Sequence, residues 1–121
     1  MSKDILIVDD SPSVRRMVTM TLSQAQFEVH EAENGAEGLR MSRTKRFDMV
    51  ITDQNMPVMT GLEFIRAFRG EPQNRGIPIV FLSTESAISL KEEARSAGAL
   101  GWMQKPFEPT QLLAVVRKVL G

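Results

Sequence analysis

Four short apolar runs, separated by longer amphipathic stretches, limit this chain to a small set of folds. The runs cover residues 5–8, 49–51, 79–82 and 100–103. Uninterrupted runs of this length are typical of strands in a parallel sheet that is covered on both faces. Residues 27–30 alternate apolar and polar side chains instead, which favours a half-exposed strand at an edge of the sheet.

Five helices are predicted around these strands, over residues 13–26, 35–43, 62–68, 86–97 and 109–120. The first carries apolar side chains three and four positions apart, as an amphipathic helix does. Gly70 and Gly98 offer stops for the third and fourth helices. Gly38, inside the second helix, costs about 1 kcal/mol relative to alanine. This alternation predicts an α/β fold with a doubly wound, five-stranded parallel sheet.

Length and composition exclude several classes of protein. The chain has 121 residues, so we expect one domain over residues 1–121. Basic and acidic residues number 15 each, which leaves no basic footprint for nucleic acid. The absence of cysteine excludes a disulfide framework and a cysteine zinc site. No apolar run approaches the ~20 residues that span a bilayer, and no signal peptide is evident. We therefore expect a cytoplasmic monomer.

Polar side chains follow four of the predicted strands. Asp9 and Asp10 follow the first strand, Asp53 the third, Ser83 the fourth and Lys105 the fifth. In an open α/β sheet, ligands bind outside the carboxyl ends of the strands. Three carboxylates, a hydroxyl and an ammonium are therefore expected to meet at one edge of the sheet.

These residue types indicate a particular chemistry. Three neighbouring carboxylates repel one another, so a bound cation is expected to relieve the repulsion. Oxygen ligands without nearby histidine or cysteine favour a hard ion such as Mg²⁺. A remaining carboxylate can act as a nucleophile and form an aspartyl phosphate. The lysine can stabilise charge on the transferred phosphoryl oxygens.

Four separated motifs resemble those of a known family. They are Asp9-Asp10, residues 53–61 beginning with Asp53, residues 83–85 beginning with Ser83, and residues 105–107 beginning with Lys105. In this order and after these strands, they closely resemble receiver domains of two-component signalling. The resemblance covers essentially the whole chain and is greatest to stand-alone chemotaxis regulators of the CheY type. It implies a flavodoxin-like sheet with strand order 2-1-3-4-5.

The resemblance implies roles for the acidic residues. Asp53 is the phosphoacceptor and also binds Mg²⁺. Asp10 binds the ion directly, Asn55 binds it through its backbone carbonyl, and Asp9 binds it through water. Asn55 and Glu85 form the pair that flanks the path of attacking water in chemotaxis-type members.

It also implies roles for the remaining site residues. Lys105 pairs with the phosphoryl oxygens, and a cis bond is usual between Lys105 and Pro106. Ser83 supplies a hydroxyl that closes onto the phosphoryl group. Trp102 occupies the aromatic switch position of the output surface.

The expected function is a signalling switch and not an enzyme, although it would catalyse its own phosphorylation and dephosphorylation. The phosphodonor is a phosphohistidine on a histidine kinase. The target is a downstream protein such as a flagellar switch or a kinase, and a phosphatase is a further partner. A phosphorelay intermediate and a phosphate sink are alternatives within the same family.

Two other classes fit the residues less well. A phosphohydrolase of the haloacid dehalogenase type needs an acid two residues after its nucleophilic aspartate, but Asn55 stands there. A flavodoxin-like cofactor binder needs a phosphate-binding loop after the first strand, where Asp9 and Asp10 would repel a phosphate.

Several residues also have purely structural interpretations. Asp9-Asp10 could form a turn or a helix cap, Ser83 could cap the following helix, and Trp102 could be ordinary core packing. We interpret Arg15 and five other basic residues as solvated charges: Arg16, Arg40, Arg43, Lys45 and Arg46. His30, on the predicted edge strand, is not expected to take part in the site.

Overall fold

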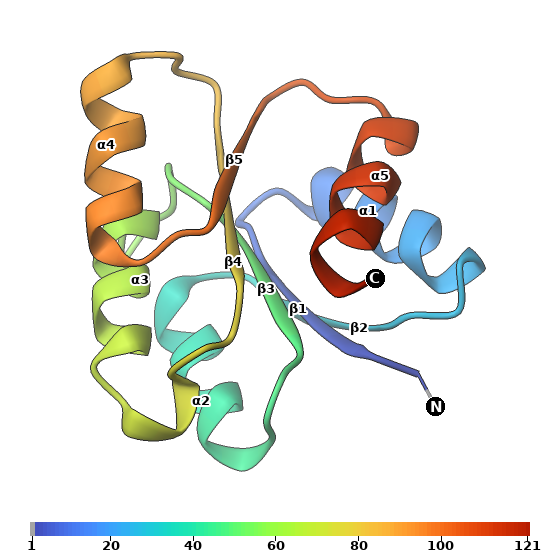
Figure 1. Cartoon of the computed structure of the whole chain (residues 1–121), viewed down its shortest axis with the longest axis horizontal. Helices are drawn as coiled ribbons and strands as arrows, with labels where there is room; N and C mark the ends of the chain where they lie inside the picture. Colours follow the sequence, from blue (N-terminus) through green and yellow to red (C-terminus); the bar gives the residue numbers. More distant parts are fainter. Residues whose placement is uncertain (1) are drawn as a thin grey trace.

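The computed structural model describes residues 2–121, which form a five-stranded parallel sheet with helices on both faces (Figure 1). The strand order is β2-β1-β3-β4-β5, as the resemblance implied. The strands are β1 (Asp4–Val8), β2 (Glu28–Ala32), β3 (Met49–Asp53), β4 (Ile79–Ser83) and β5 (Gly101–Gln104).

The helices divide between the two faces of the sheet. Helices α1 (Pro12–Gln24) and α5 (Pro109–Leu120) lie on one face. Helices α2 (Gly35–Thr44), α3 (Gly61–Arg69) and α4 (Ile88–Ala97) lie on the other, and a short 3₁₀ turn, Pro72–Asn74, follows α3. None of the described helices is both long enough and apolar enough to cross a membrane.

The strands β1, β3 and β4 are buried because both of their faces are covered. Successive side chains of a strand point to opposite faces. Leu6 and Val8 therefore join the apolar cluster beneath α2, α3 and α4. Ile5 and Ile7 join the cluster beneath α1 and α5. Two-sided burial explains why these strands appear in the sequence as continuous apolar runs.

The two edge strands differ in how well the sequence predicted them. Strand β2 is an edge strand, as its alternating pattern indicated, although it runs from Glu28 to Ala32 and leaves Phe27 outside. The prediction that β5 is covered on both faces was wrong. It pairs only with β4, Met103 is its one buried residue, and Leu100 is exposed before the strand begins.

The helices begin and end within two residues of the predicted positions, and the largest differences are the end of α1, at Gln24 and not Gln26, and the start of α4. Helix α4 begins at Ile88, two residues later than expected, and the Ala87 side chain cannot cap it. The Ser83 hydroxyl accepts a hydrogen bond from the Glu85 backbone N–H at 3.0 Å. Such local side-chain bonds compete with helix formation, which delays the start of α4.

Gly38 in α2 has a packing role that offsets its low helix propensity. A β-carbon at this position would lie 3.0 Å from the Phe64 ring and 3.1 Å from a Val8 methyl group. The absence of a side chain lets α2 pack close to both the sheet and α3.

Candidate functional site

The loops after β1, β3, β4 and β5 bring the predicted site residues together at the carboxyl edge of the sheet. The loops after β4 and β5 lie at the top of Figure 1. Carboxylate oxygens of Asp9, Asp10 and Asp53 all lie within 4.8 Å of one another. The backbone N–H of Lys105 donates to the Ser83 carbonyl at 2.8 Å, which fixes the fifth loop beside the fourth.

The three carboxylates have different surroundings. Asp9 is fully buried, and its Oδ1 accepts a hydrogen bond from the Ser11 backbone N–H at 2.9 Å. Its Oδ2 accepts one from Lys105 Nζ at 2.8 Å. The same ammonium lies 3.2 Å from Asp53 Oδ1. Asp53 is buried, whereas Asp10 is exposed. Lys105 therefore bridges two buried acids, and Asp10 faces solvent.

Burial and charge act in opposition at Asp53 and Lys105. Burial raises the pKa of Asp53, the Asp9 charge raises it further, and Lys105 only partly offsets these effects. Burial alone would lower the pKa of Lys105, but its ion pairs with Asp9 and Asp53 outweigh burial and raise that pKa. The ammonium thus remains charged, while the fold resists ionisation of Asp53.

The loop between Asp53 and α3 is held by two hydrogen bonds to Gln54. The backbone N–H of Gly61 donates to the Gln54 carbonyl at 3.0 Å, and the N–H of Leu62 donates to Gln54 Oε1 at 3.0 Å. Asn55 lies exposed within this loop. This role of Gln54 was not predicted, because a glutamine after a strand is not a recognised loop-closing signal.

Gly61 permits the closest backbone approach at the site. A β-carbon there would clash with the Asp53 carbonyl and would lie 2.9 Å from Gln54 Cα. Thr60 and Glu63 form a capping box, which starts α3 at this point. Because α3 begins against the backbone of Asp53, it positions the loop that joins Asp53 to α3.

The same loop contains one strained residue. Val58 has a φ of 74°, in the left-handed region that L-residues with branched side chains avoid. Its side chain is 79% exposed, so no packing requires valine there.

Ser83 and Trp102 lie on adjacent strands. Ser83 is buried at the end of β4, and it does not cap α4, so the capping interpretation was wrong. Trp102 is half-buried on the edge strand β5, with its ring centroid 6.4 Å from that of Phe81. The Nζ atom of Lys91, on α4, lies 4.4 Å from the centroid of the Trp102 ring.

Arg15 is not a solvated charge. Its side chain is 16% exposed, its Nη1 donates to the Asp9 carbonyl at 2.5 Å, and its Nε lies 3.2 Å from Glu31 Oε1. It therefore fixes the backbone that presents Asp9. Arg15 follows the helix cap Ser11 by four residues, a spacing that places it one turn above that loop.

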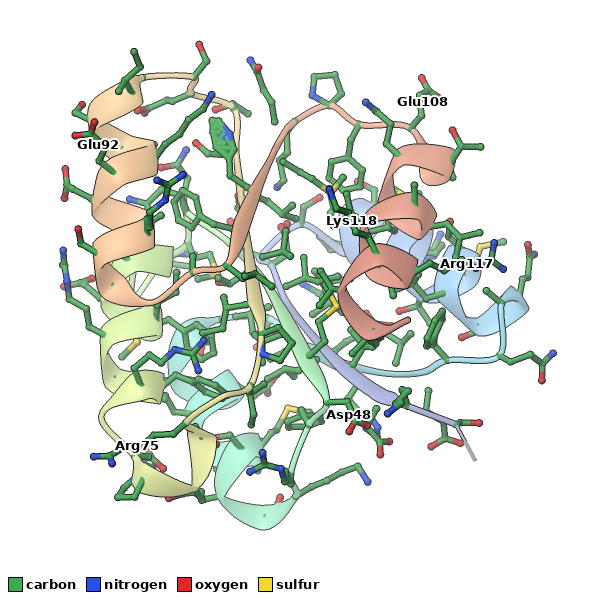
Figure 2. All side chains as sticks on the ribbon, in the orientation of Figure 1. Asp48, Arg75, Glu92, Glu108, Arg117 and Lys118 are labelled. Atoms are coloured by element: carbon green, nitrogen blue, oxygen red, sulfur yellow. The ribbon has the colours of Figure 1, made fainter. Side chains whose placement is uncertain are left out.

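Other parts of the structure agree with the expected arrangement. The peptide bond between Lys105 and Pro106 is cis. His30 Nε2 lies 3.0 Å from Asp4 Oδ1, at the amino end of β1, whereas Asp9 follows its carboxyl end. Figure 2 shows Arg75 and Glu92 pointing outward from the molecule.

The donor set fits a hard divalent cation. All three clustered side chains offer carboxylate oxygens, and histidine and cysteine, the softer ligands, are absent from this cluster of described residues. Oxygen ligands of this kind suit Mg²⁺, which commonly retains several waters and uses one or two carboxylates. Asp10 is the acid most accessible to an ion arriving from solvent.

The fold and this site define a class of protein. Residues 5–117 match the model of the response regulator receiver domain, so the chain belongs to that family. It is therefore a signalling protein, the receiver domain of a two-component response regulator.

Among the similar proteins and solved structures are chemotaxis proteins. The chain is 34% identical to the chemotaxis protein CheY of Pseudomonas aeruginosa, over 95% of this chain and 94% of that one. The structure of chemotaxis protein CheY4 of Vibrio cholerae superposes with a TM-score of 0.95 at 44% identity, covering 98% of this chain and 99% of that one.

A second kind of relative is longer. The chain is 32% identical to the transcriptional regulatory protein SrrA of Staphylococcus aureus, over 99% of its own length but only 48% of SrrA. The chain thus spans about half of that relative.

Proposed function

We propose that this chain is a phosphorylation-activated switch in which Asp53 accepts a phosphoryl group from a histidine kinase, with Mg²⁺ as cofactor. The observation that carries the proposal is the single ammonium of Lys105 placed between two buried acids, 2.8 Å from Asp9 and 3.2 Å from Asp53. Buried ion pairs of this kind contribute little net stability, which supports a functional role for the three groups.

Transfer begins with attack by a carboxylate oxygen of Asp53 on the phosphorus atom. The new bond joins phosphorus to that oxygen, while the bond from phosphorus to the kinase histidine breaks and the imidazole keeps the electron pair. Lys105 pairs with the phosphoryl oxygens, as its ammonium already lies beside Asp53. Bound Mg²⁺ supplies positive charge against the same oxygens.

The surroundings of each acid support a division of ligand roles. Asp9 already accepts hydrogen bonds from Ser11 and Lys105, which suits contact with the ion through water. Asp10 and Asp53 bind the ion directly, together with the backbone carbonyl of Asn55. Self-catalysed loss of the phosphoryl group uses water that enters between Asn55 and Glu85, both of which are exposed.

The output surface comprises α4, β5 and α5. Ser83 closes onto the phosphoryl group, and Trp102 then turns from its half-buried position toward the space that Ser83 leaves. A target protein that prefers the new surface shifts the population toward it. The likeness to chemotaxis proteins supports a target in chemotaxis or flagellar motor control.

Two alternatives within the family use the same chemistry. A phosphorelay intermediate would pass the group to another histidine, and a phosphate sink would only hydrolyse it. A phosphohydrolase of small esters is disfavoured, because Asn55 cannot serve as the general acid. We also propose that residues 1–121 form a single receiver domain.

The test is phosphorylation by acetyl phosphate with Mg²⁺, followed by intact-mass measurement and alkali treatment. We expect one alkali-labile phosphoryl group, lost in Asp53→Asn and retained in Asp48→Asn, an aspartate just before the same strand. Stoichiometric labelling of Asp53→Asn would overturn the assignment. A panel of histidine kinases, followed by binding assays with the phosphorylated form, then identifies the partners.

Lys105→Arg tests the role of the ammonium. A planar guanidinium cannot replace a compact charge at a shared site. We expect Mg²⁺ affinity to change little, and phosphorylation or target binding to be impaired. Normal phosphorylation together with normal target binding would contradict the role of Lys105.

A further inference from the structure

The contact between Lys91 and Trp102 joins α4 to the edge strand β5. Lys91 Nζ lies 4.4 Å from the centroid of the indole ring, within the ~6 Å reach of a cation–π interaction, and tryptophan is the aromatic side chain that binds cations best. Lys91 is exposed on α4, and Trp102 is half-buried. The ammonium therefore stabilises the indole in its present position.

The sheet register shows what an inward rotation would do to this contact. Phe81 pairs with Trp102, and Ser83 pairs with Gln104, in the parallel ladder of β4 and β5. Paired residues share a face, and residues two apart along a strand share it too. Trp102 and Ser83 therefore lie on the same face, the one that α4 covers. Ser83 is buried whereas Lys91 is exposed, so an inward rotation of the indole toward Ser83 would break its contact with Lys91.

We propose that Lys91 is a positioning residue that holds Trp102 in its half-buried position and so sets how strongly the phosphoryl group must act to turn the switch. The inference rests on the proposed function, because it assumes that Trp102 moves. What it adds is that Lys91 on α4, outside the phosphorylation site, stabilises one position of Trp102 over the other.

A nearby cation provides a matched control. Arg95 lies one turn after Lys91 on α4 and lines the same surface hollow as Trp102, together with Ala94 and Leu100. The cation–π contact is made by Lys91. Glu92, which follows Lys91, points outward from α4 in Figure 2 and tests the effect of net charge alone.

The experiment titrates the Mg²⁺-loaded protein with beryllium fluoride, a phosphoryl mimic, and follows emission from the single tryptophan. Lys91→Met keeps the length of the side chain and removes its charge. Before any beryllium fluoride is added, we expect the tryptophan emission of Lys91→Met to be shifted already toward that of the beryllium fluoride form. The beryllium fluoride concentration at the midpoint of the titration should be about two- to fivefold lower than for wild type. Lys91→Arg should restore the wild-type midpoint, because guanidinium also binds aromatic faces. Arg95→Met and Glu92→Gln should leave it unchanged.

The outcomes separate this inference from the proposed function. A wild-type response with an unchanged midpoint in Lys91→Met overturns the role of Lys91 and leaves the moving Trp102 intact. Equal shifts in Lys91→Met and Arg95→Met also overturn it, because they would show a general charge effect. If the wild-type emission does not respond to beryllium fluoride, Trp102 is static and both hypotheses are wrong.

Discussion

At the scale of single residues, two opposing effects act on the pKa of the buried Asp53 carboxyl group: burial raises it and the Lys105 ammonium lowers it. Burial and Asp9 raise its pKa, so the fold favours the protonated form. Its contribution to stability is therefore complete below about pH 3.8, the ordinary value, and is lost as the pH rises through the raised pKa. At neutral pH and without Mg²⁺, the ionised carboxyl group costs stability.

Asp53→Asn should accordingly raise the melting temperature at pH 7 in the absence of Mg²⁺, because the amide cannot ionise. The difference from wild type should shrink as the pH falls toward 3.8. Thermal unfolding from pH 3.5 to 8 measures this difference, and Glu92→Gln, which removes an exposed carboxylate, serves as the control. If Asp53→Asn were less stable than wild type at pH 7, the ionised Asp53 carboxylate would not be destabilising the fold, contrary to this prediction.

A second prediction at this scale concerns Val58, whose φ of 74° strains a branched side chain. The left-handed conformation costs roughly 1–2 kcal/mol for an ordinary residue, and asparagine tolerates it best after glycine. Val58→Asn should therefore raise the free energy of unfolding by about 1 kcal/mol. Urea denaturation checks this value. Val58→Ala keeps the β-carbon, so it should gain less, and an equal gain would point to a cause other than backbone strain.

The sequence predicted individual site residues well where each stands directly after a strand. Asp9 and Lys105 do so, Asp53 is the last residue of β3, and the structure brings all three together. It failed for Arg15 and Gln54, because their roles depend on contacts with backbone carbonyl and N–H groups. Such contacts leave no pattern in the residue types alone.

At the scale of elements, the start of α3 controls the geometry of the loop that joins Asp53 to α3. Gly61→Ala should place a methyl group against the Asp53 carbonyl, which must then move. We expect a loss of about 1–3 kcal/mol in stability, with weaker Mg²⁺ binding by calorimetry. Gly101→Ala is the matched control, since a β-carbon there meets no atom within 4 Å. Unchanged Mg²⁺ binding in Gly61→Ala would show that the loop tolerates displacement.

The elements differ in how far their sequence determines them. Continuous apolar runs identified β1, β3 and β4, because two-sided burial imposes that composition. The run that includes β5 looks similar, yet β5 is a half-exposed edge strand. An exposed apolar residue such as Leu100 cannot be distinguished from a buried one by its type, so the pattern misled there. The late start of α4 was missed because it depends on the hydrogen bond between Ser83 and Glu85.

At the scale of the whole molecule, cation binding should stabilise the folded chain. Mg²⁺ that binds only the native state adds RT ln(1 + [L]/Kd), about 2.7 kcal/mol at a hundredfold excess over Kd. The melting temperature at low ionic strength should therefore rise with Mg²⁺ concentration. Asp10→Ala should weaken the effect more than Asp9→Ala, since Asp9 is already engaged by Lys105. A melting temperature that Mg²⁺ does not change would argue against a preformed site.

The strand order 2-1-3-4-5 came from the family resemblance and not from periodicity. Hydrophobic patterns show which segments are strands, but they do not show which strands are neighbours. The pairing of β1 with β3 lies between segments more than forty residues apart, as Ile5 with Met49. In the sequence, only the four motifs indicated which strands are neighbours, because the strand ends that carry them must lie close together.

The ion pair between Lys105 and Asp9 spans 96 residues, nearly the whole chain. No short segment of the chain contains both residues, so the site forms only when the loops after β1 and β5 are brought together in the folded sheet. Contacts this distant in sequence carry an entropic cost of loop closure. Under the proposed function, phosphoryl acceptance by Asp53 would therefore be restricted to correctly folded molecules. In a partly denatured sample, the fraction of chains phosphorylated on Asp53 should equal the fraction that is folded. Phosphorylation would then measure how much of the sample is native.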